Sequence, residues 1–276
     1  MFNLLLAIFS SAMVSVVMRL SDGKVKYNLG MLVMNYLMCS LLGAASTGIH
    51  FPADSRLLPT AGMGVINGIL YLVSFILFQM NVRRNGVVLS ATFMKLGLLV
   101  TMVVSVCFYG EIPGVRQALG FLLAVAAIVM INYRKEEGVP GFQAGLPLLL
   151  LCGGMADAMS KIFEESGITG MGSCFLLVTF ATAMILCFFY MLRQKQSIGK
   201  SEILYGLLIG IPNFYSSKFL LWALADVPAV IAYPVYSVGT ILVVTLTGIC
   251  LFRERLIKRQ WIALGIILAA LILLNT

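Results

Sequence analysis

The chain alternates between long apolar runs and short polar breaks. Ten runs of about 17 to 23 residues are each close to the ~20 apolar residues that a helix needs to cross a bilayer. The breaks, such as SDGKVK, NVRRNG and RKEEGVP, are rich in Gly, Pro and charge. The pattern predicts an all-α integral membrane protein with ten transmembrane helices at about 2–18, 29–49, 60–80, 86–108, 115–133, 142–162, 170–192, 202–222, 228–250 and 258–274.

The sequence of the first half recurs in the second. Gly64-x-x-x-Gly68 in the third run returns as Gly206-x-x-x-Gly210 in the eighth, a shift of 142 (206 − 64). Cys107-x-x-x-Glu111 likewise returns as Cys250-x-x-x-Glu254, a shift of 143 (250 − 107), and each copy is followed by Arg-Gln. We therefore expect two five-helix repeats, 1–138 and 139–276. Because five is odd, the second repeat must enter the membrane from the opposite side, which predicts inverted repeats of the kind found in secondary transporters.

Composition supports a membrane protein and excludes several other classes. The chain is 61% hydrophobic and 11% charged, with a mean hydropathy of +1.01. Ten helices of ~20 residues leave roughly 76 of the 276 residues, too few for an ectodomain, an ATPase domain or a nucleic-acid-binding module. The six cysteines lie in apolar runs and there is a single histidine, so neither a metal site, a disulfide framework nor a cofactor is expected. The first run lacks the basic leader and cleavage site of a signal peptide, and we expect it to be the first span.

The basic residues indicate an orientation. Of the 19 Lys and Arg, fourteen lie in breaks after odd-numbered runs and three in breaks after even-numbered runs. Positive residues concentrate in cytoplasmic loops, so the odd breaks are expected in the cytoplasm and both chain ends outside, in the cell (inner) membrane. The net charge of +8 follows from this topology and is not evidence of nucleic-acid binding.

The ends of the two repeats resemble a known family. GEIPGVRQALGFLLAVAAIVM and RERLIKRQWIALGIILAALILL each carry a Glu before a helix of small residues, within ten spans in two five-helix halves. This arrangement is similar to the drug/metabolite transporter superfamily, in its EamA-type branch. The resemblance implies a transporter with a central cavity lined by the third, fourth, eighth and ninth spans. Arg253 departs from the Gly that many members have before the second Glu, whereas Gly110 fits the pattern.

Two lysines lie inside predicted spans, where a charged side chain is costly and is treated first as functional. Lys95 is near the middle of the fourth span, too far from either interface to reach it easily. Its surroundings also resemble the fourth-span lysine of nucleotide-sugar transporters in the same superfamily, which implies contact with an anionic part of the substrate. A structural ion pair is the alternative. Lys218 in the eighth span is nearer a helix end, where its ammonium could instead extend to the interface.

Acidic residues have competing interpretations. Asp157 in the sixth span is four residues before Lys161, so the two could pair along one helical face. Alternatively, Asp157 binds a coupling proton or a cation. Glu111 and Glu254 occupy equivalent repeat positions, where each is expected to complement the positive end of the following helix. Gating ion pairs with Arg116 and Arg259 are the alternative.

Uncharged polar residues complete the candidate binding site. By the family resemblance they line the cavity, and an ordinary interhelical hydrogen bond is the alternative for each. Neighbours three or four residues apart, as in Asn67 with Tyr71 and Asn213 with Ser217, share a helical face. The set is Asn35, Asn67, Tyr71, Asn213, Ser217, Tyr233 and Tyr236.

These features predict a secondary transporter that moves a small polar or amphiphilic metabolite by alternating access. Two intramembrane lysines against one aspartate favour a substrate with an anionic group. The alternative is a proton-coupled exporter of amino acids or amphiphilic cations. An intramembrane enzyme is not expected, since the sequence has no H-E-x-x-H motif or paired intramembrane carboxylates, and no nucleotide-binding loop is present.

Overall fold

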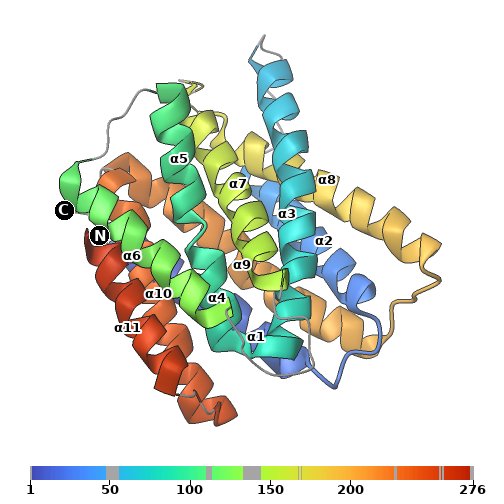
Figure 1. The fold of residues 1–276 in the computed structure, drawn as a ribbon. Helices are drawn as coiled ribbons and strands as arrows, with labels where there is room; N and C mark the ends of the chain where they lie inside the picture. Colours follow the sequence, from blue (N-terminus) through green and yellow to red (C-terminus); the bar gives the residue numbers. More distant parts are fainter. Residues whose placement is uncertain are drawn as a thin grey trace.

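The protein is a bundle of helices (Figure 1). The computed structural model describes residues 2–47, 56–109, 114–132, 144–166, 168, 170–226, 229–254, 256 and 258–273, and every regular element in these ranges is an α-helix. The described elements are α1 (Phe2–Ser21), α2 (Asn28–Thr47), α3 (Leu57–Asn85), α4 (Val87–Lys95), α5 (Leu98–Tyr109), α6 (Val115–Asn132), α7 (Gly145–Glu165), α8 (Gly172–Arg193), α9 (Lys200–Asp226), α10 (Ala229–Phe252) and α11 (Lys258–Leu273).

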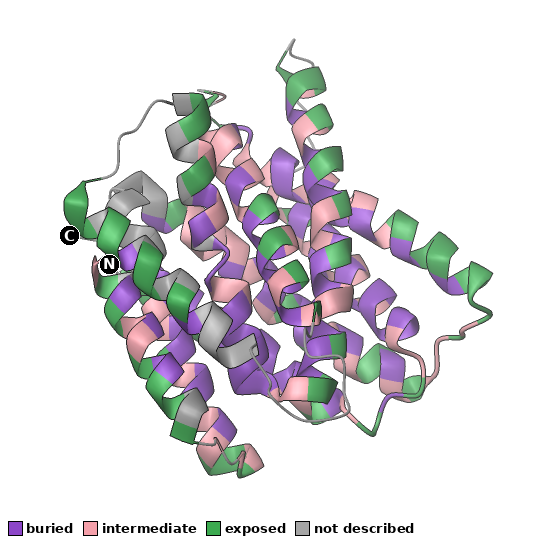
Figure 2. Ribbon diagram, in the orientation of Figure 1, coloured by how far each residue is buried: buried purple, intermediate pink, exposed green. Residues whose placement is uncertain are grey.

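Length and composition make several of these helices suitable for a membrane. Within the described ranges, α1, α2, α3, α7, α8 and Val235–Phe252 of α10 are long and apolar enough to span a bilayer. Many large apolar residues are exposed, and Figure 2 shows exposed positions along the helices of the bundle. Phe9, Phe189 and Leu246, for example, are each more than half exposed. A surface of this kind suits contact with lipid acyl chains, because the helices satisfy their own backbone hydrogen bonds.

The fourth predicted span differs from expectation, because the structure divides it into α4 and α5. The break falls at Leu96 and Gly97, where the Gly97 amide donates to the Met94 carbonyl at 3.2 Å instead of continuing the helix. A Cβ on Gly97 would lie 2.7 Å from the Gly154 Cα atom on α7. The two backbones therefore meet at this crossing, and Lys95 is the last residue of α4.

Helices of the two halves pack mainly against each other. In the first half, α2 contacts α8 and α9, and α1 contacts α9 and α10. In turn, α3 contacts α7 and α8, while α4 contacts α7 and α10 and α5 contacts α7. Helices α6 and α11 pack side by side at the edge of the bundle (Figure 1).

The repeated Gly-x-x-x-Gly motifs form two close helix crossings. A Cβ on Gly68 of α3 would lie 2.5 Å from the Thr179 carbonyl oxygen of α8. A Cβ on Gly210 of α9 would lie 2.6 Å from the Met38 Cβ atom of α2. Small residues allow helix backbones to approach closely in membranes, so each motif sets the distance between its helix and one from the other half.

Candidate functional site

A central cavity lies among helices of both halves. Its volume is about 60 Å³, enough for a few water molecules. Side chains from α1, α3, α4, α7, α9 and α10 line it: Ser11, Val14, Ser15, Tyr71, Ser74, Phe75, Phe78, Ala91, Met94, Lys95, Gly153, Ala156, Asp157, Asn213, Ser216, Ser217 and Tyr236.

Equivalent positions of the two halves face this cavity. Of the 17 lining residues, twelve form six pairs that are each separated by 142, the shift of the Gly-x-x-x-Gly repeat (213 − 71, for example). Three pairs join α1 to α7 and three join α3 to α9. The pairs are Ser11 with Gly153, Val14 with Ala156, Ser15 with Asp157, Tyr71 with Asn213, Ser74 with Ser216, and Phe75 with Ser217.

The Lys95 side chain is in the cavity wall. Its Nζ atom lies 3.7 Å from the centre of the Tyr236 ring on α10, a distance suited to a cation–π contact. Asp157 of α7 lines the same cavity. The cavity therefore presents one ammonium and one carboxylate, from opposite halves of the chain.

Two chemically different walls complete the cavity. On the α3 wall, Tyr71 stacks on Phe75 with ring centres 5.9 Å apart and an interplanar angle of 17°. On the α9 wall, Ser216 is 2.8 Å from the hydroxyl of Tyr236. The Tyr71 hydroxyl joins the two walls through a 3.0 Å hydrogen bond with Ser217.

Other predicted site residues lie away from the cavity lining. Asn35 of α2 is fully buried and accepts a 3.2 Å hydrogen bond from the Asn213 side chain, so it supports a lining residue. Asn67 of α3 is also buried, and neither polar atom of its amide has a hydrogen-bond partner in the structure. Lys218 of α9 donates to the Ser46 hydroxyl at 2.9 Å and lies 4.8 Å from the Trp222 ring centre.

The remaining candidates have different outcomes. Lys161 is half-buried on α7 and is not among the residues that line the described cavity. The Tyr233 side chain and the whole of Glu111 lie outside the described residues. Ser11, Ser15, Ser74 and Ser216 line the cavity although the polar pattern did not select them. The shift of 142 could have found Ser15, because it maps this residue onto the candidate Asp157.

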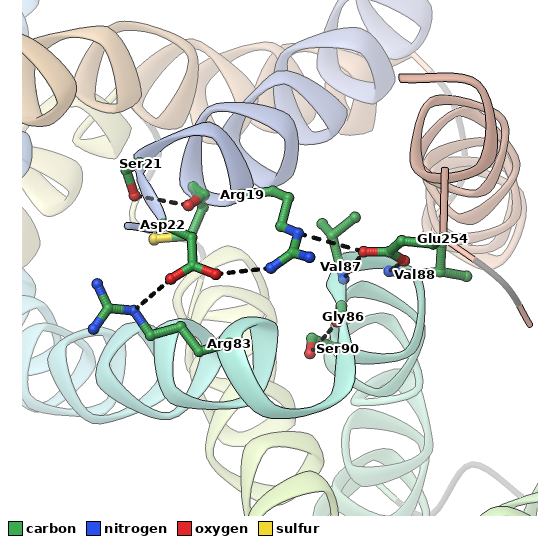
Figure 3. A network of polar contacts seen from close by, with 10 residues as sticks. Arg19, Ser21, Asp22, Arg83, Gly86, Val87, Val88, Ser90 and Glu254 are labelled. Carbon is green, nitrogen blue, oxygen red and sulfur yellow. Dashed lines mark hydrogen bonds and ion pairs between the residues drawn. The ribbon is translucent and has the colours of Figure 1, made fainter. Parts of the chain in front are cut away.

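Glu254 binds the start of a helix in the other half (Figure 3). Its carboxylate accepts hydrogen bonds from the backbone amides of Val87 at 2.8 Å and Val88 at 3.3 Å, at the N-terminus of α4. The sequence predicted that Glu254 would complement the helix following it, α11. The described contacts instead place it at α4, where the positive end of the helix dipole favours a carboxylate.

Basic residues extend this contact into a network. The Arg19 Nε atom lies 3.6 Å from the Glu254 carboxylate, and Arg19 also forms a 2.8 Å ion pair with Asp22. Asp22 in turn pairs with Arg83 at 3.2 Å. We call Arg19, Asp22, Arg83, Glu254 and the N-terminus of α4 the Glu254 network. Both acids of the network, Asp22 and Glu254, have ion-pair partners. The alternative ion pair of Glu254 with Arg259 involves a side chain that lies outside the described residues.

The lining residues suit the binding of a small molecule. Among the described residues, no group of three or more His, Cys, Asp or Glu is placed to hold a metal ion. A cavity with one cation, one anion, hydroxyl groups and an aromatic wall can orient a small molecule through its charges and its apolar surface.

Comparisons with known proteins agree with this class of protein. A multi-pass helical membrane protein with a polar cavity between its halves is expected of a transporter. The family model of the EamA-like transporter family matches residues 1–133 and again residues 147–276, and the chain belongs to that family.

Two relatives extend the comparison. The chain is 23% identical to an uncharacterized protein of Haemophilus influenzae (strain ATCC 51907 / DSM 11121 / KW20 / Rd), over 98% of this chain and 96% of that protein. It also resembles a solved structure, titled only as a crystal structure of a protein, with a TM-score of 0.64 and 14% identity. That match covers 98% of this chain and 97% of the other. The second likeness concerns the fold alone.

Proposed function

We propose that the protein is a secondary transporter that moves a small amphiphilic metabolite by alternating access through the central cavity. Membership of a transporter family supports the general class. The observation that carries the finer proposal is that Lys95 and Asp157 line one cavity together with the aromatic α3 wall. An anionic group on the substrate would bind Lys95 in place of solvent.

The packing supports two repeats related by a two-fold axis. If α1, α2, α3, α4 and α6 are exchanged with α7, α8, α9, α10 and α11, the main helix contacts map onto one another. The α1–α9 contact becomes α7–α3, α2–α9 becomes α8–α3, and α1–α10 becomes α7–α4. The α2–α8, α4–α10 and α6–α11 contacts map onto themselves. Since each repeat is predicted to cross the membrane five times, the axis would lie in the membrane plane, and rocking of one half on the other would alternate access.

The proposed orientation follows from the charge distribution. The ends of α1 and α3 that carry Arg19 and Arg83 lie on one face of the bundle, joined by the Glu254 network. Basic residues are most frequent in the breaks assigned to this face, so we propose that it is cytoplasmic, with both termini outside, in the cell (inner) membrane.

Substrate counterflow in proteoliposomes tests the proposal. A panel of small carboxylates, phosphates, zwitterions and cations is offered to wild-type protein. Lys95→Ala is expected to lower transport of the preferred anionic or zwitterionic substrate on the order of 10- to 100-fold, the cost of losing a charge-assisted contact. Lys218→Ala is the matched control, because it also removes a lysine from a predicted span. Lys218 donates a hydrogen bond to Ser46 and lies outside the cavity lining, so this variant is expected to retain most activity. Unchanged transport in Lys95→Ala would contradict the anionic-substrate proposal.

Asp157 favours a second candidate function, the proton-coupled export of amino acids or amphiphilic cations. A carboxylate in the cavity wall could bind either the cationic group of a substrate or a coupling proton. Under this alternative, Asp157→Asn abolishes proton-driven transport while substrate-driven exchange in the absence of a pH gradient persists. If Asp157 binds only the substrate, both modes are lost together.

A further inference from the structure

The Glu254 network lies directly beyond one end of the cavity. On α1, the network residue Arg19 is four residues after the lining residue Ser15. On α4, the capped residue Val87 is four residues before the lining residue Ala91. Four residues are about one helical turn, or ~6 Å, and keep the same face of the helix. Each helix therefore presents a cavity residue and, one turn away, a network residue.

An apolar layer separates the cavity from the network. Met18, Phe78 and Val82 are each 1% exposed, and they belong to the same buried cluster as Val87. A substrate leaving the cavity toward this face would have to displace this layer and then break the ion pairs. This end of the cavity is closed in the structure.

The other end of the cavity is different. The start of α1 packs against the end of α9, so the two helices run antiparallel and the last turns of α9 lie far from Arg19. There a second cavity shares Tyr71, Asp157, Ser217 and Tyr236 with the first and continues past Ser160 and Leu221.

Equivalent positions reveal the contrast between the two ends. Met18, Phe78 and Gln79 are buried at the network end. Their counterparts 142 residues later, Ser160, Leu220 and Leu221, are only half-buried and line the second cavity. The same repeat positions are therefore packed shut at one end and loosely packed at the other.

We propose that the Glu254 network is the gate that closes the cavity toward the face where α1 ends, and that Glu254 couples this gate to the binding site through α4. The helix is nine residues long, with Glu254 at its N-terminus and Lys95 as its last residue. Movement of the capped end therefore moves Lys95. Glu254 is a positioning residue in this proposal, which rests on the proposed alternating-access function.

The opposite end carries the charges for a second gate of the same kind. Arg19 and Asp22 form an ion pair three residues apart on α1 and its following turn. Shifted by 142, these positions are Lys161 and Glu164, also a base and an acid three residues apart, at the end of α7. When the cavity is open toward the network face, Lys161 and Glu164 are expected to form part of a gate that closes the other end.

Cysteine labelling from each side of sealed membrane vesicles tests the gate. A membrane-impermeant maleimide is applied to Ser15→Cys and, separately, to Ser160→Cys, with labelling read at that residue by peptide mass spectrometry. Residue 15 is expected to label slowly from the network face, and residue 160 to label readily from the opposite face. Adding Glu254→Gln is expected to speed labelling at residue 15 about tenfold and to slow labelling at residue 160, because loss of a charge-assisted contact shifts the equilibrium toward the other state.

Glu202→Gln is the matched control. The Glu202 carboxylate accepts hydrogen bonds from the backbone amides of Lys26 and Tyr27, each at 3.0 Å, just before the start of α2 on the same face. Glu202 lies on α9 but about three turns before its first lining residue, Asn213, and α2 contributes no residue to the described cavity lining. This variant is therefore expected to change neither labelling rate.

A second pair of variants guards against misfolding. Asp22→Arg is expected to open the gate, because it breaks the ion pairs with both Arg19 and Arg83. Asp22→Arg with Arg83→Asp is expected to close it again only in part, because it restores an ion pair between positions 22 and 83 but not the pair with Arg19.

The results separate a gate from a merely structural contact. Labelling at residue 15 that is unchanged in folded Glu254→Gln and in Asp22→Arg would overturn the proposal. A rise at both residues 15 and 160 would also overturn it, because it indicates general loosening rather than an exchange of accessible ends. The labelling needs no substrate, so the gate can be confirmed even if every transport assay of the proposed function fails.

Discussion

The α3 and α9 walls of the cavity occupy equivalent positions in the two halves of the chain but have different chemistry. Where α3 presents Tyr71 and Phe75, α9 presents Asn213 and Ser217. The third pair on these walls, Ser74 and Ser216, is unchanged. Positions in the cavity lining therefore recur in the two halves at a shift of 142, whereas several of the side chains at those positions differ.

The charged residues extend this difference. Asp157 of α7 corresponds to Ser15 of α1, a shift of 142 (157 − 15), and both line the cavity. Lys95 of α4 corresponds to Val238 of α10, a shift of 143 (238 − 95). A substrate with unlike ends would therefore bind in one orientation, even within a nearly symmetric frame. The comparison teaches that the positions of the cavity lining can repeat while the side chains that would determine substrate specificity differ between the halves.

The largest expected effect comes from moving the carboxylate between the halves. Asp157→Ser should weaken binding of a substrate with unlike ends on the order of 10- to 100-fold, because it removes the carboxylate that the cavity lining offers to the cationic end. The double variant Asp157→Ser with Ser15→Asp should recover part of this loss, since it returns a carboxylate to the equivalent wall. Ligand-induced shifts in melting temperature on the purified proteins measure both. Failure of the double variant to improve on Asp157→Ser would mean that the two positions are not interchangeable.

A smaller effect is expected at the glycine crossings, and here the halves should behave alike. Gly68→Ala and Gly210→Ala each place a Cβ within about 2.5–2.6 Å of the facing helix, so each should destabilise the protein by about 1–3 kcal/mol. Gly62→Ala on the same α3 helix is the control, because a Cβ there meets nothing within 4 Å and alanine is the better helix former. Thermal unfolding in detergent should show lowered stability for the first two variants alone. If only one of Gly68→Ala and Gly210→Ala lowered the stability, the two helix crossings would not be structurally equivalent.

The smallest effect is expected where one hydroxyl joins the two walls. Tyr71→Phe removes the 3.0 Å hydrogen bond with Ser217 while keeping the ring that stacks on Phe75. Substrate affinity should fall about two- to tenfold, the range for one neutral hydrogen bond. Tyr190→Phe, on the exposed outer part of α8, should leave affinity unchanged in the same binding assay. Equal affinities of the wild type, Tyr71→Phe and Tyr190→Phe would show that the Tyr71 hydroxyl does not contribute to substrate binding.

Sequence analysis predicted the features that repeat or depend on local composition. The apolar runs indicated a helical membrane protein, and the resemblance at the ends of the two halves indicated the family that the family model then matched. The shift found from Gly64 and Gly206 also relates the cavity-lining residues of α1 to α7 and of α3 to α9. Local periodicity and repetition can be read from one sequence because they need no knowledge of which helices meet.

Contacts between distant segments could not be predicted in the same way. Nothing in the apolar run around Gly97 signals the break between α4 and α5, which coincides with its close contact with Gly154 of α7. The partners of Glu254 are Arg19 and the start of α4, more than 160 residues away. Lys218, like Lys95, was a candidate because it lies inside a predicted span, although nearer a helix end. The packing of α9 against α2 instead gives it Ser46 as a partner outside the cavity lining.

The central claim is that two five-helix halves lie in the membrane with opposite orientations and share one cavity. Its most direct test is the sidedness of epitope tags placed at the N-terminus, at the C-terminus and between the halves near residue 140. The account predicts that both terminal tags are reached from the same side of intact cells and the middle tag only from the other side. A middle tag on the same side as the termini would give both halves the same orientation and would contradict the account.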